Sequence, residues 1–148
     1  RRSSDLKTTL EERKEFEDYT EEELSELYNM FDVYVQTAGA EGFGIPLLEA
    51  MSCGVPVIAP DYSACSELVH DRGILLSPCF HRIVDAASVE QVSIKADELA
   101  RALETLYSDD ESREKMGMRG RVFAESMNWN VFSDRWLDVL SNVKWEKK

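Results

Sequence analysis

The residues of this sequence that could do chemistry gather in one short stretch, AEGFGIPLLEAMSCGVPVIAP, at positions 40–60. Two glutamates, Glu41 and Glu49, have E-x7-E spacing and bracket a Gly-Phe-Gly turn. An ionised carboxylate only accepts hydrogen bonds, so each glutamate suits a partner rich in hydroxyl groups, such as a sugar or a ribose. Gly42 and Gly44 lack a Cβ, which allows the backbone to come close to a ligand.

The same turn is predicted to open a helix. Pro46 lies where the first turn of a helix tolerates proline, because the N–H that it lacks would have no partner there. The free N–H groups near Ile45 would carry partial positive charge, which suits a phosphate. Together these features predict a nucleotide-sugar site. A generic strand-to-helix turn remains open as the second interpretation, because a glycine turn alone is a weak motif.

The elements around this turn alternate between strands and helices. Strands are predicted at 32–37, 55–60 and 73–78, with helices between them at 45–54 and 64–69. A capping box formed by Thr20 and Glu23 starts an earlier helix near 21–30. This alternation favours an α/β fold with an open, Rossmann-like parallel sheet. Ligands bind such sheets beyond the carboxyl ends of the strands, where the turn 37–45 lies.

The rest of the chain is predicted to be mostly helical. Residues 79–93 indicate a loop or small hairpin inserted before a helix whose apolar side chains span 96–106. Ser108 and Glu111 form a second potential capping box, which would start the following helix. The fold is therefore expected to have a helical C-terminus.

Composition narrows the class of partner. The formal net charge is −12, and acidic residues crowd positions 11–26. Such a surface repels nucleic acid and anionic lipid, so neither is expected as a partner. Cys53, Cys65 and Cys79 are odd in number and lack C-x-x-C spacing, which favours reduced core thiols in a cytosolic protein over disulfides or a zinc site. No apolar stretch reaches the roughly 18 residues of a membrane span.

The stretch EGFGIPLLEAMSCGVPVIA resembles the signature of the retaining glycosyltransferases of family 4, glycosyl transferases group 1. In that signature an E-x7-E pair surrounds G-F-G-x-P and is followed by a segment of the type E-A-x-A/S-x-G-x-P-V-I. The segments EELSELYNMFDVYV, SELVHDRGILLSP and RGRVFAESMNWNVFSDRWLDVL are similar to the family as well. The resemblance covers about residues 18–145, apart from 79–93.

The resemblance implies a GT-B fold, in which two Rossmann-like domains face a cleft. Residues 18–148 would then be part of the C-terminal, donor-binding domain, preceded by a polar arm or helix at 1–17. Glu41 would be the catalytic residue that hydrogen-bonds hydroxyls of the transferred sugar, and Glu49 would bind the ribose hydroxyls. Ile45 would line the diphosphate and nucleoside region.

The resemblance also assigns a role to the backbone of the turn. Gly42, Phe43 and Gly44 would offer N–H groups to the sugar and the phosphate. The reaction implied is glycosyl transfer from an NDP-sugar to a hydroxyl of an acceptor glycan, lipid or small molecule, with retention at the anomeric carbon. No metal and no cofactor are expected, because fixed cations and a helix N-terminus stabilise the leaving diphosphate. The implied location is the cytoplasm, with peripheral membrane association of the full-length enzyme left open.

Two parts of such an enzyme are missing from this sequence. The family's diphosphate-binding cations come from a G-R-x4-K-G segment, and the sequence starts after that point. Arg2 and Lys7 have R-x4-K spacing but lack the preceding strand and the glycines, which favours coincidence. The acceptor-binding N-terminal half is also missing, so the chain alone is not expected to catalyse. The alternative is a stand-alone, non-catalytic module that binds a nucleotide-sugar or pairs with a separate subunit.

Other polar candidates have simpler explanations. His70 and His81 are expected at the surface or in loops rather than as a catalytic base. Glu67 matches a recurrent glutamate of the family, but a hydrogen bond from helix to loop explains it equally well. Asp61 and Tyr62 follow a strand end and are candidates for the edge of the pocket.

The last helix carries an apolar series at helical spacing, namely Trp129, Phe132, Trp136, Leu140 and Val143. The two tryptophans are expected as core anchors rather than stacking platforms. In the family that the sequence resembles, this helix crosses back to the N-terminal domain, so exposed apolar residues here would fit a missing partner.

Overall fold

The computed structural model describes residues 19–84 and 89–143, so the predicted arm at 1–17 and the Arg2–Lys7 pair lie outside the described residues. The helices are α2 (Glu21–Tyr28), α3 (Ile45–Ser52), α4 (Ala64–Val69), α5 (Ala96–Ser108), α6 (Asp110–Ser126) and α7 (Trp129–Asn142). The strands are β1 (Tyr34–Val35), β2 (Val57–Pro60), β3 (Ile74–Leu76), β4 (Phe80–Val84) and β5 (Val89–Ser93).

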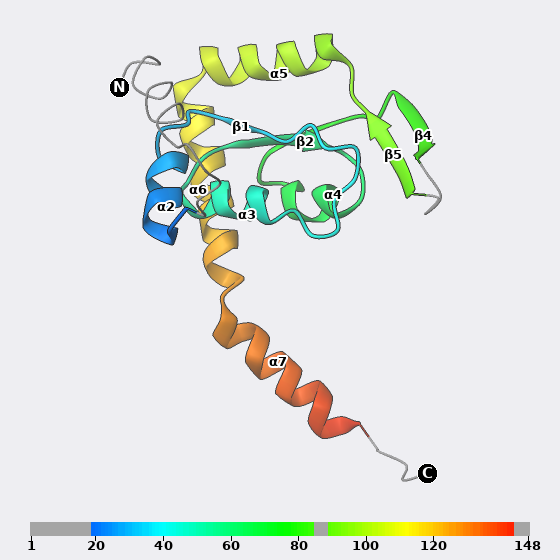
Figure 1. Ribbon diagram of the computed structural model, residues 1–148. Coiled ribbons are helices and arrows are strands. Elements are labelled where there is room, and N and C mark those ends of the chain that lie inside the picture. Colours follow the sequence, from blue (N-terminus) through cyan, green and yellow to red (C-terminus); the bar gives the residue numbers. More distant parts are fainter. Residues whose placement is uncertain (1–18, 85–88, 144–148) are drawn as a thin grey trace.

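The first three strands form one parallel sheet in the order β1-β2-β3, which confirms the predicted α/β fold. Tyr34 lies opposite Val57, and Ile58 lies opposite Ile74. In the described part of the chain β1 pairs with β2 alone, so β1 forms one edge of the sheet. Helix α5 covers one face of the sheet and α3 and α4 cover the other (Figure 1).

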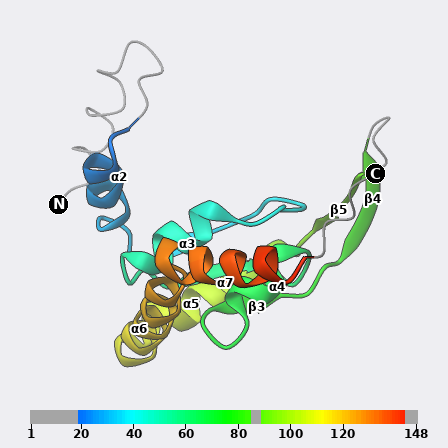
Figure 2. The same ribbon diagram turned by 90° about the horizontal axis from the view of Figure 1, so that it is seen from below.

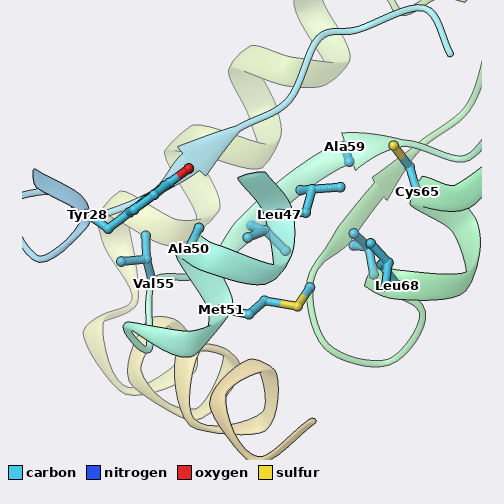
Figure 3. Close-up of a cluster of buried hydrophobic side chains, with 10 residues drawn as sticks. Tyr28, Leu47, Ala50, Met51, Val55, Ala59, Cys65 and Leu68 are labelled. Carbon is cyan, nitrogen blue, oxygen red and sulfur yellow. The ribbon is translucent and has the colours of Figure 1, made fainter. Parts of the chain in front are cut away.

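Two hydrophobic clusters hold these layers together, one on each face. Strand β2 is fully buried and alternates between them, because successive side chains of a strand point to opposite faces. Val57 and Ala59 join the cluster formed with α2, α3 and α4, whereas Ile58 packs towards α5. Figure 3 shows the first cluster, in which Leu47 and Met51 are completely buried. Each such side chain stabilises the fold by about 1.5–3 kcal/mol.

Helix α6 packs directly against the end of α3. A Cβ added at Gly117 would lie 2.1 Å from the carbonyl oxygen of Gly54, so glycine is required for this approach of two backbones. The guanidinium of Arg72 lies 3.8 Å from the centre of the Phe123 ring and donates to the Leu68 carbonyl at 2.9 Å. The end of α4 is thereby attached to α6.

The predicted capping box at Ser108 and Glu111 is wrong. Ser108 is the last residue of α5, where its hydroxyl donates to the Glu104 carbonyl at 2.7 Å. Asp109 caps α6 instead, and its side chain accepts from the Ser112 N–H at 2.9 Å. The Ser112 hydroxyl also donates to Asp109, and these bonds lower the pKa of that carboxyl. A carboxylate that accepts two hydrogen bonds is the stronger cap at the positive end of a helix.

The segment predicted as a loop or small hairpin is a hairpin. Strands β4 and β5 pair antiparallel, with Phe80 opposite Ser93 and Val84 opposite Val89. This two-stranded sheet is separate from the parallel sheet. It projects from the end of the molecule opposite α2, beyond the carboxyl ends of β1 and β2 (Figures 1 and 2).

Helix α7 extends away from the body of the molecule (Figure 1). The expectation that Trp129 and Trp136 anchor it in the core is wrong, because their side chains are 84% and 63% exposed. The helical spacing of apolar residues correctly predicted an amphipathic helix, but no described element covers its apolar face. None of the described helices combines the length and apolar character needed to cross a membrane.

Candidate functional site

The segment from Gln36 to Gly44, here called the site loop, connects β1 to α3. It ends at Gly44, whose φ of 89° lies in the left-handed region that favours glycine. The Gly44 carbonyl accepts from the Leu47 N–H at 3.0 Å and so begins α3 at Ile45, as predicted. A Cβ on Gly44 would also lie 3.1 Å from Leu68, so both the backbone conformation and the packing require this glycine.

The turn that precedes α3 presents the backbone of Gly42 and Phe43 to the surface, whereas Gly44 is buried. Within the described residues, the N–H groups of Gly42, Phe43 and Gly44 make no hydrogen bond. Gly42 and the side chains of Phe43 and Ile45 are exposed. A Cβ added at Gly42 would meet nothing within 4 Å, so space is open beside it. Consecutive free N–H groups at the start of a helix suit an anionic or oxygen-rich ligand.

Glu41 is half-buried at the edge of this turn and is held at two points. Its carboxylate oxygen Oε1 accepts from Gln36 Nε2 at 2.6 Å, and its backbone N–H donates to Ser63 Oγ at 3.0 Å. Gln36 follows β1 directly, and Ser63 caps the start of α4. The end of a strand and the start of a helix therefore orient Glu41.

Glu49 lies on α3 and faces α2. Its Oε2 accepts from the Tyr28 hydroxyl at 2.9 Å. Tyr28 is 6% exposed, and burial, together with the hydrogen bond to Glu49, raises the pKa of its hydroxyl far above the ordinary value. Glu49 also lines a cavity of about 240 Å³ with Ser25 and Ser52. Only one of its two carboxylate oxygens takes the bond from Tyr28.

Tyr34 lies between the two carboxylates. Burial, and then the charges of Glu41 and Glu49, raise the pKa of Tyr34 above its ordinary value. The Tyr34 hydroxyl donates to Gln36 Oε1 at 3.4 Å, and its ring packs edge-on against Tyr28 with 5.9 Å between centroids. The structure thus brings both predicted glutamates into one network, which Tyr28, Tyr34 and Gln36 complete.

The sequence interpretation did not assign these three partners. The tyrosines fitted the apolar pattern of a helix and a strand, and only the buried position of their rings was foreseeable. Gln36 carried a signal, because it is a polar residue at the carboxyl end of an apolar strand, where ligands of parallel sheets bind.

The other predicted residues lie outside this network. His70 and His81 are exposed, as expected, and each lies beside a carboxylate, Asp71 at 3.4 Å and Glu90 at 2.9 Å respectively. Glu67 is exposed on α4.

The remaining candidates are Asp61 and Tyr62, which follow β2 directly, and the three cysteines. Asp61 is exposed, and the ring of Tyr62 packs edge-on against His81 of the hairpin. Of the free cysteines, Cys65 is buried, Cys53 is half-buried and Cys79 is exposed, so only the first is a core thiol. In the described ranges no cluster of three His, Cys, Asp or Glu residues is placed to hold a metal ion.

Comparison with known proteins shows the family to which the chain is similar. Residues 2–123 match the family described as Glycosyl transferases group 1. The chain is 37% identical over 109 residues to O-antigen chain mannosyltransferase B of Escherichia coli, covering 74% of this chain and 25% of that protein. It is 35% identical over 109 residues to D-inositol 3-phosphate glycosyltransferase of Paenarthrobacter aurescens, covering 72% of this chain and 23% of that protein.

Solved structures share the fold. Anabaena Alr3699/HepE in complex with UDP-glucose superposes with a TM-score of 0.63 at 24% identity, covering 82% of this chain and 30% of that one. The C-terminal domain of the group 1 protein LpcC from Francisella tularensis gives 0.57 at 24% identity, covering 84% and 58%. These likenesses confirm the C-terminal part of a GT-B fold. The chain spans about a quarter of the length of the curated relatives that it matches.

Proposed function

Since the chain belongs to the glycosyl transferases group 1 family, we propose that the whole protein transfers a sugar from a nucleotide-sugar to an acceptor hydroxyl and that this chain supplies part of the donor site. One observation carries the proposal. Glu41, held by Gln36 and Ser63, lies directly beside the free N–H groups of the Gly42–Gly44 turn. Sugar hydroxyls and a phosphate are the two partners that such neighbouring groups suit.

In this proposal Glu41 is the catalytic residue. Its carboxylate accepts hydrogen bonds from hydroxyls of the sugar that is transferred, and Gln36 fixes the carboxylate in place. Because the donor loses its diphosphate in the transition state, contacts that strengthen there raise the rate. The free N–H groups of Gly42, Phe43 and Gly44 face the sugar and the phosphate oxygens, with Ile45 beside the diphosphate and nucleoside.

Glu49 binds the ribose end of the donor. Tyr28 occupies its Oε2, so Oε1 stays available to a ribose hydroxyl. The neighbouring cavity of about 240 Å³ gives room on the α2 side of this carboxylate. Glu41 and Glu49 would then hold opposite ends of one ligand.

Retention at the anomeric carbon is part of the proposal and is supported by the resemblance to family 4. The same resemblance suggests a reaction without a metal or a cofactor, in which fixed cations from outside this chain balance the diphosphate. We place the reaction in the cytoplasm, where free thiols such as Cys65 persist. The acceptor is a glycan, a lipid or a small molecule that carries a hydroxyl group.

The partner of this chain in the proposal is the N-terminal half of a GT-B enzyme. Two unpaired surfaces support it, the outer edge of β1 and the apolar face of α7. Trp136 and Leu137 are 63% and 66% exposed in the described structure, and contact with another domain would bury them. The reported relatives are themselves glycosyltransferases, which favours this arrangement over a stand-alone binding module.

Calorimetric titration tests the donor site. UDP-, GDP- and ADP-sugars are titrated into the protein. The series begins with GDP-mannose, because the Escherichia coli relative is a mannosyltransferase. In the full-length natural protein, Glu41→Gln should weaken transition-state binding by about 1–3 kcal/mol, the scale of a hydrogen bond to a charged group. The fall in kcat/KM measures this loss. Glu67→Gln, at an exposed carboxylate on α4, is the control. Full turnover by Glu41→Gln would refute the assigned role.

A further inference from the structure

The hairpin β4–β5 contacts the site loop two residues before Glu41. The Val92 N–H donates to the Gly39 carbonyl at 2.9 Å. A Cβ added at Gly39 would lie 2.9 Å from the Cβ of Gln91 and 3.0 Å from the Val92 carbonyl. Real Cβ atoms essentially never come so close to other heavy atoms, so the hairpin and the loop pack backbone against backbone and only glycine permits it.

A second attachment reaches Glu41 through Ser63. The hydroxyl of Ser63 accepts from the Glu41 N–H, and the preceding residue, Tyr62, packs edge-on against His81 with 5.8 Å between ring centroids. Glu90 of β5 lies 2.9 Å from His81 Nδ1. Burial and the neighbouring Glu90 carboxylate raise the pKa of Tyr62. Glu90 therefore connects the hairpin to the segment that holds the Glu41 backbone.

The hairpin contributes little to the hydrophobic core. Among its described side chains Val92 is buried, whereas Phe80 and Ile83 are 57% and 74% exposed. Neither hydrophobic cluster includes any of the β4 and β5 side chains that the structure describes. An isolated two-stranded hairpin is at best marginally stable, so its contacts with the site loop and with Tyr62 matter for both partners.

We propose that the β4–β5 hairpin positions the site loop, with Val92 and Glu90 as positioning residues that act on Glu41 through Gly39 and Ser63. The two attachments fix the loop on both sides of a single residue, Ala40, and thereby set where the Glu41 carboxylate and the free N–H groups point. For its consequence on donor binding this inference rests on the proposed function, but the positioning itself is measurable without any donor.

Hydrogen exchange of single backbone amides, followed by NMR, tests the first attachment. Gly39→Ala forces the hairpin away from the loop, and exchange of the Glu41 amide should accelerate by about fivefold to tenfold, the effect of one lost hydrogen bond. The double variant Gly39→Ala with Gln91→Gly removes the closest Cβ and should recover most of the protection. Ile83→Ser changes an exposed residue of the same hairpin and should leave Glu41 unaffected.

The exchange rates of the Glu41 amide in these variants either support or overturn the proposal. An unchanged Glu41 amide in a folded Gly39→Ala protein, or an equal acceleration in Ile83→Ser, would overturn the proposal.

Glu90 gives an independent test, which stands even where Gly39→Ala does not fold. Glu90→Ala removes an exposed side chain that lies 2.9 Å from His81, whose ring packs against Tyr62, and should accelerate exchange of the Glu41 amide. Glu90→Gln keeps an acceptor oxygen and should retain most of the protection, which a charge effect alone would not. Equal rates in Glu90→Ala and the unmodified chain would refute this attachment.

Donor titration then separates the two proposals. If GDP-mannose and the other nucleotide-sugars do not bind the unmodified protein, the proposed function fails while the exchange data still decide the role of the hairpin. If a donor binds, Glu90→Ala should weaken it by about fivefold, and Glu90→Gln should not. Unchanged donor affinity combined with faster exchange at Glu41 would overturn the expected consequence for donor binding, while the positioning of the loop would stand.

Discussion

The Tyr28 hydroxyl donates a hydrogen bond to Glu49 Oε2 at 2.9 Å and thereby joins α2 to α3 at the candidate site. Figure 3 shows Tyr28 at the edge of the buried cluster that includes Leu47 and Ala50. The ring belongs to the core and the hydroxyl belongs to the site. One residue therefore links the stability of the sheet face covered by α3 to the orientation of a carboxylate that we propose binds the donor.

Tyr28→Phe should lower the free energy of unfolding by about 1 kcal/mol, because Glu49 loses a part-buried donor while the core keeps its ring. Donor affinity should fall as well, since Glu49 is no longer oriented. Chemical denaturation and calorimetric titration measure the two effects. Tyr107→Phe is the matched control, because the side chain of Tyr107 is 81% exposed. An unchanged denaturation midpoint in Tyr28→Phe would show that the bond is unimportant for folding.

Stability should decrease above a pH of about 10, the ordinary pKa of tyrosine. The folded-state pKa values of Tyr28 and Tyr34 are raised. Above this pH the unfolded chain loses these protons while the folded chain keeps them, so unfolding becomes more favourable. Each tyrosine contributes at most about 1.4 kcal/mol per pH unit to this decrease.

Denaturation curves between pH 9 and 11 (roughly the window around the ordinary tyrosine pKa) measure this slope. Tyr28→Phe should make the slope shallower, and Tyr107→Phe should not. The same slope in both variants would contradict the assignment to Tyr28.

Gln36→Leu should weaken donor binding by about tenfold, because the Glu41 carboxylate loses the 2.6 Å bond that fixes it. Gln36 is half-buried and belongs to no hydrophobic cluster, so the thermal midpoint should change little. Calorimetric titration measures the donor affinity, and a melting curve measures the thermal midpoint. Thr37→Ala, at the exposed next residue, serves as the control. If Gln36→Leu binds donor normally, Glu41 does not depend on this partner.

Gly117→Ala should destabilise the protein by about 1–3 kcal/mol through overpacking, although alanine is the better helix former by about 1 kcal/mol. The new Cβ would lie 2.1 Å from the Gly54 carbonyl oxygen, which belongs to the backbone and cannot rotate away. Gly120→Ala meets Met51 at a longer distance, with Cγ at 3.1 Å and Cβ at 3.4 Å, and should cost less. Urea denaturation ranks the two variants, and the reverse order would contradict the packing.

Trp136→Ser should leave the unfolding free energy of this chain unchanged within about 0.5 kcal/mol, because the side chain is largely exposed. In the full-length natural protein the same change should be clearly destabilising if the N-terminal half covers α7. Thermal denaturation of both proteins provides the comparison. A large loss in the chain alone would mean that α7 folds back onto the described body.

The sequence was sufficient to predict the parallel sheet and the start of α3. Short apolar runs separated by helices indicate parallel strands, and a Gly-x-Pro turn specifies where a helix begins. The hydrogen-bond partners of the two glutamates could not be predicted, because Tyr28, Tyr34 and Gln36 come together only when α2, β1 and α3 pack. Which residues meet in three dimensions is not encoded in local spacing.

Two errors have a similar physical origin. Ser108 and Glu111 have the spacing of a capping box, but Asp109 is the better cap and the helix before it continues through Ser108. For Trp129 and Trp136 the apolar periodicity correctly indicated an amphipathic helix. Periodicity does not say which element covers its apolar face, and within residues 19–84 and 89–143 none does.

The contact between Gly117 and the Gly54 carbonyl has a consequence for motion. Side chains between two helices can rotate and let the helices slide, but two backbones in direct contact cannot adjust in this way. Helices α3 and α6 should therefore move as one rigid body. When a ligand binds, conformational change near Glu41 is then confined to residues before Ile45. Glu49, on α3, keeps a fixed position.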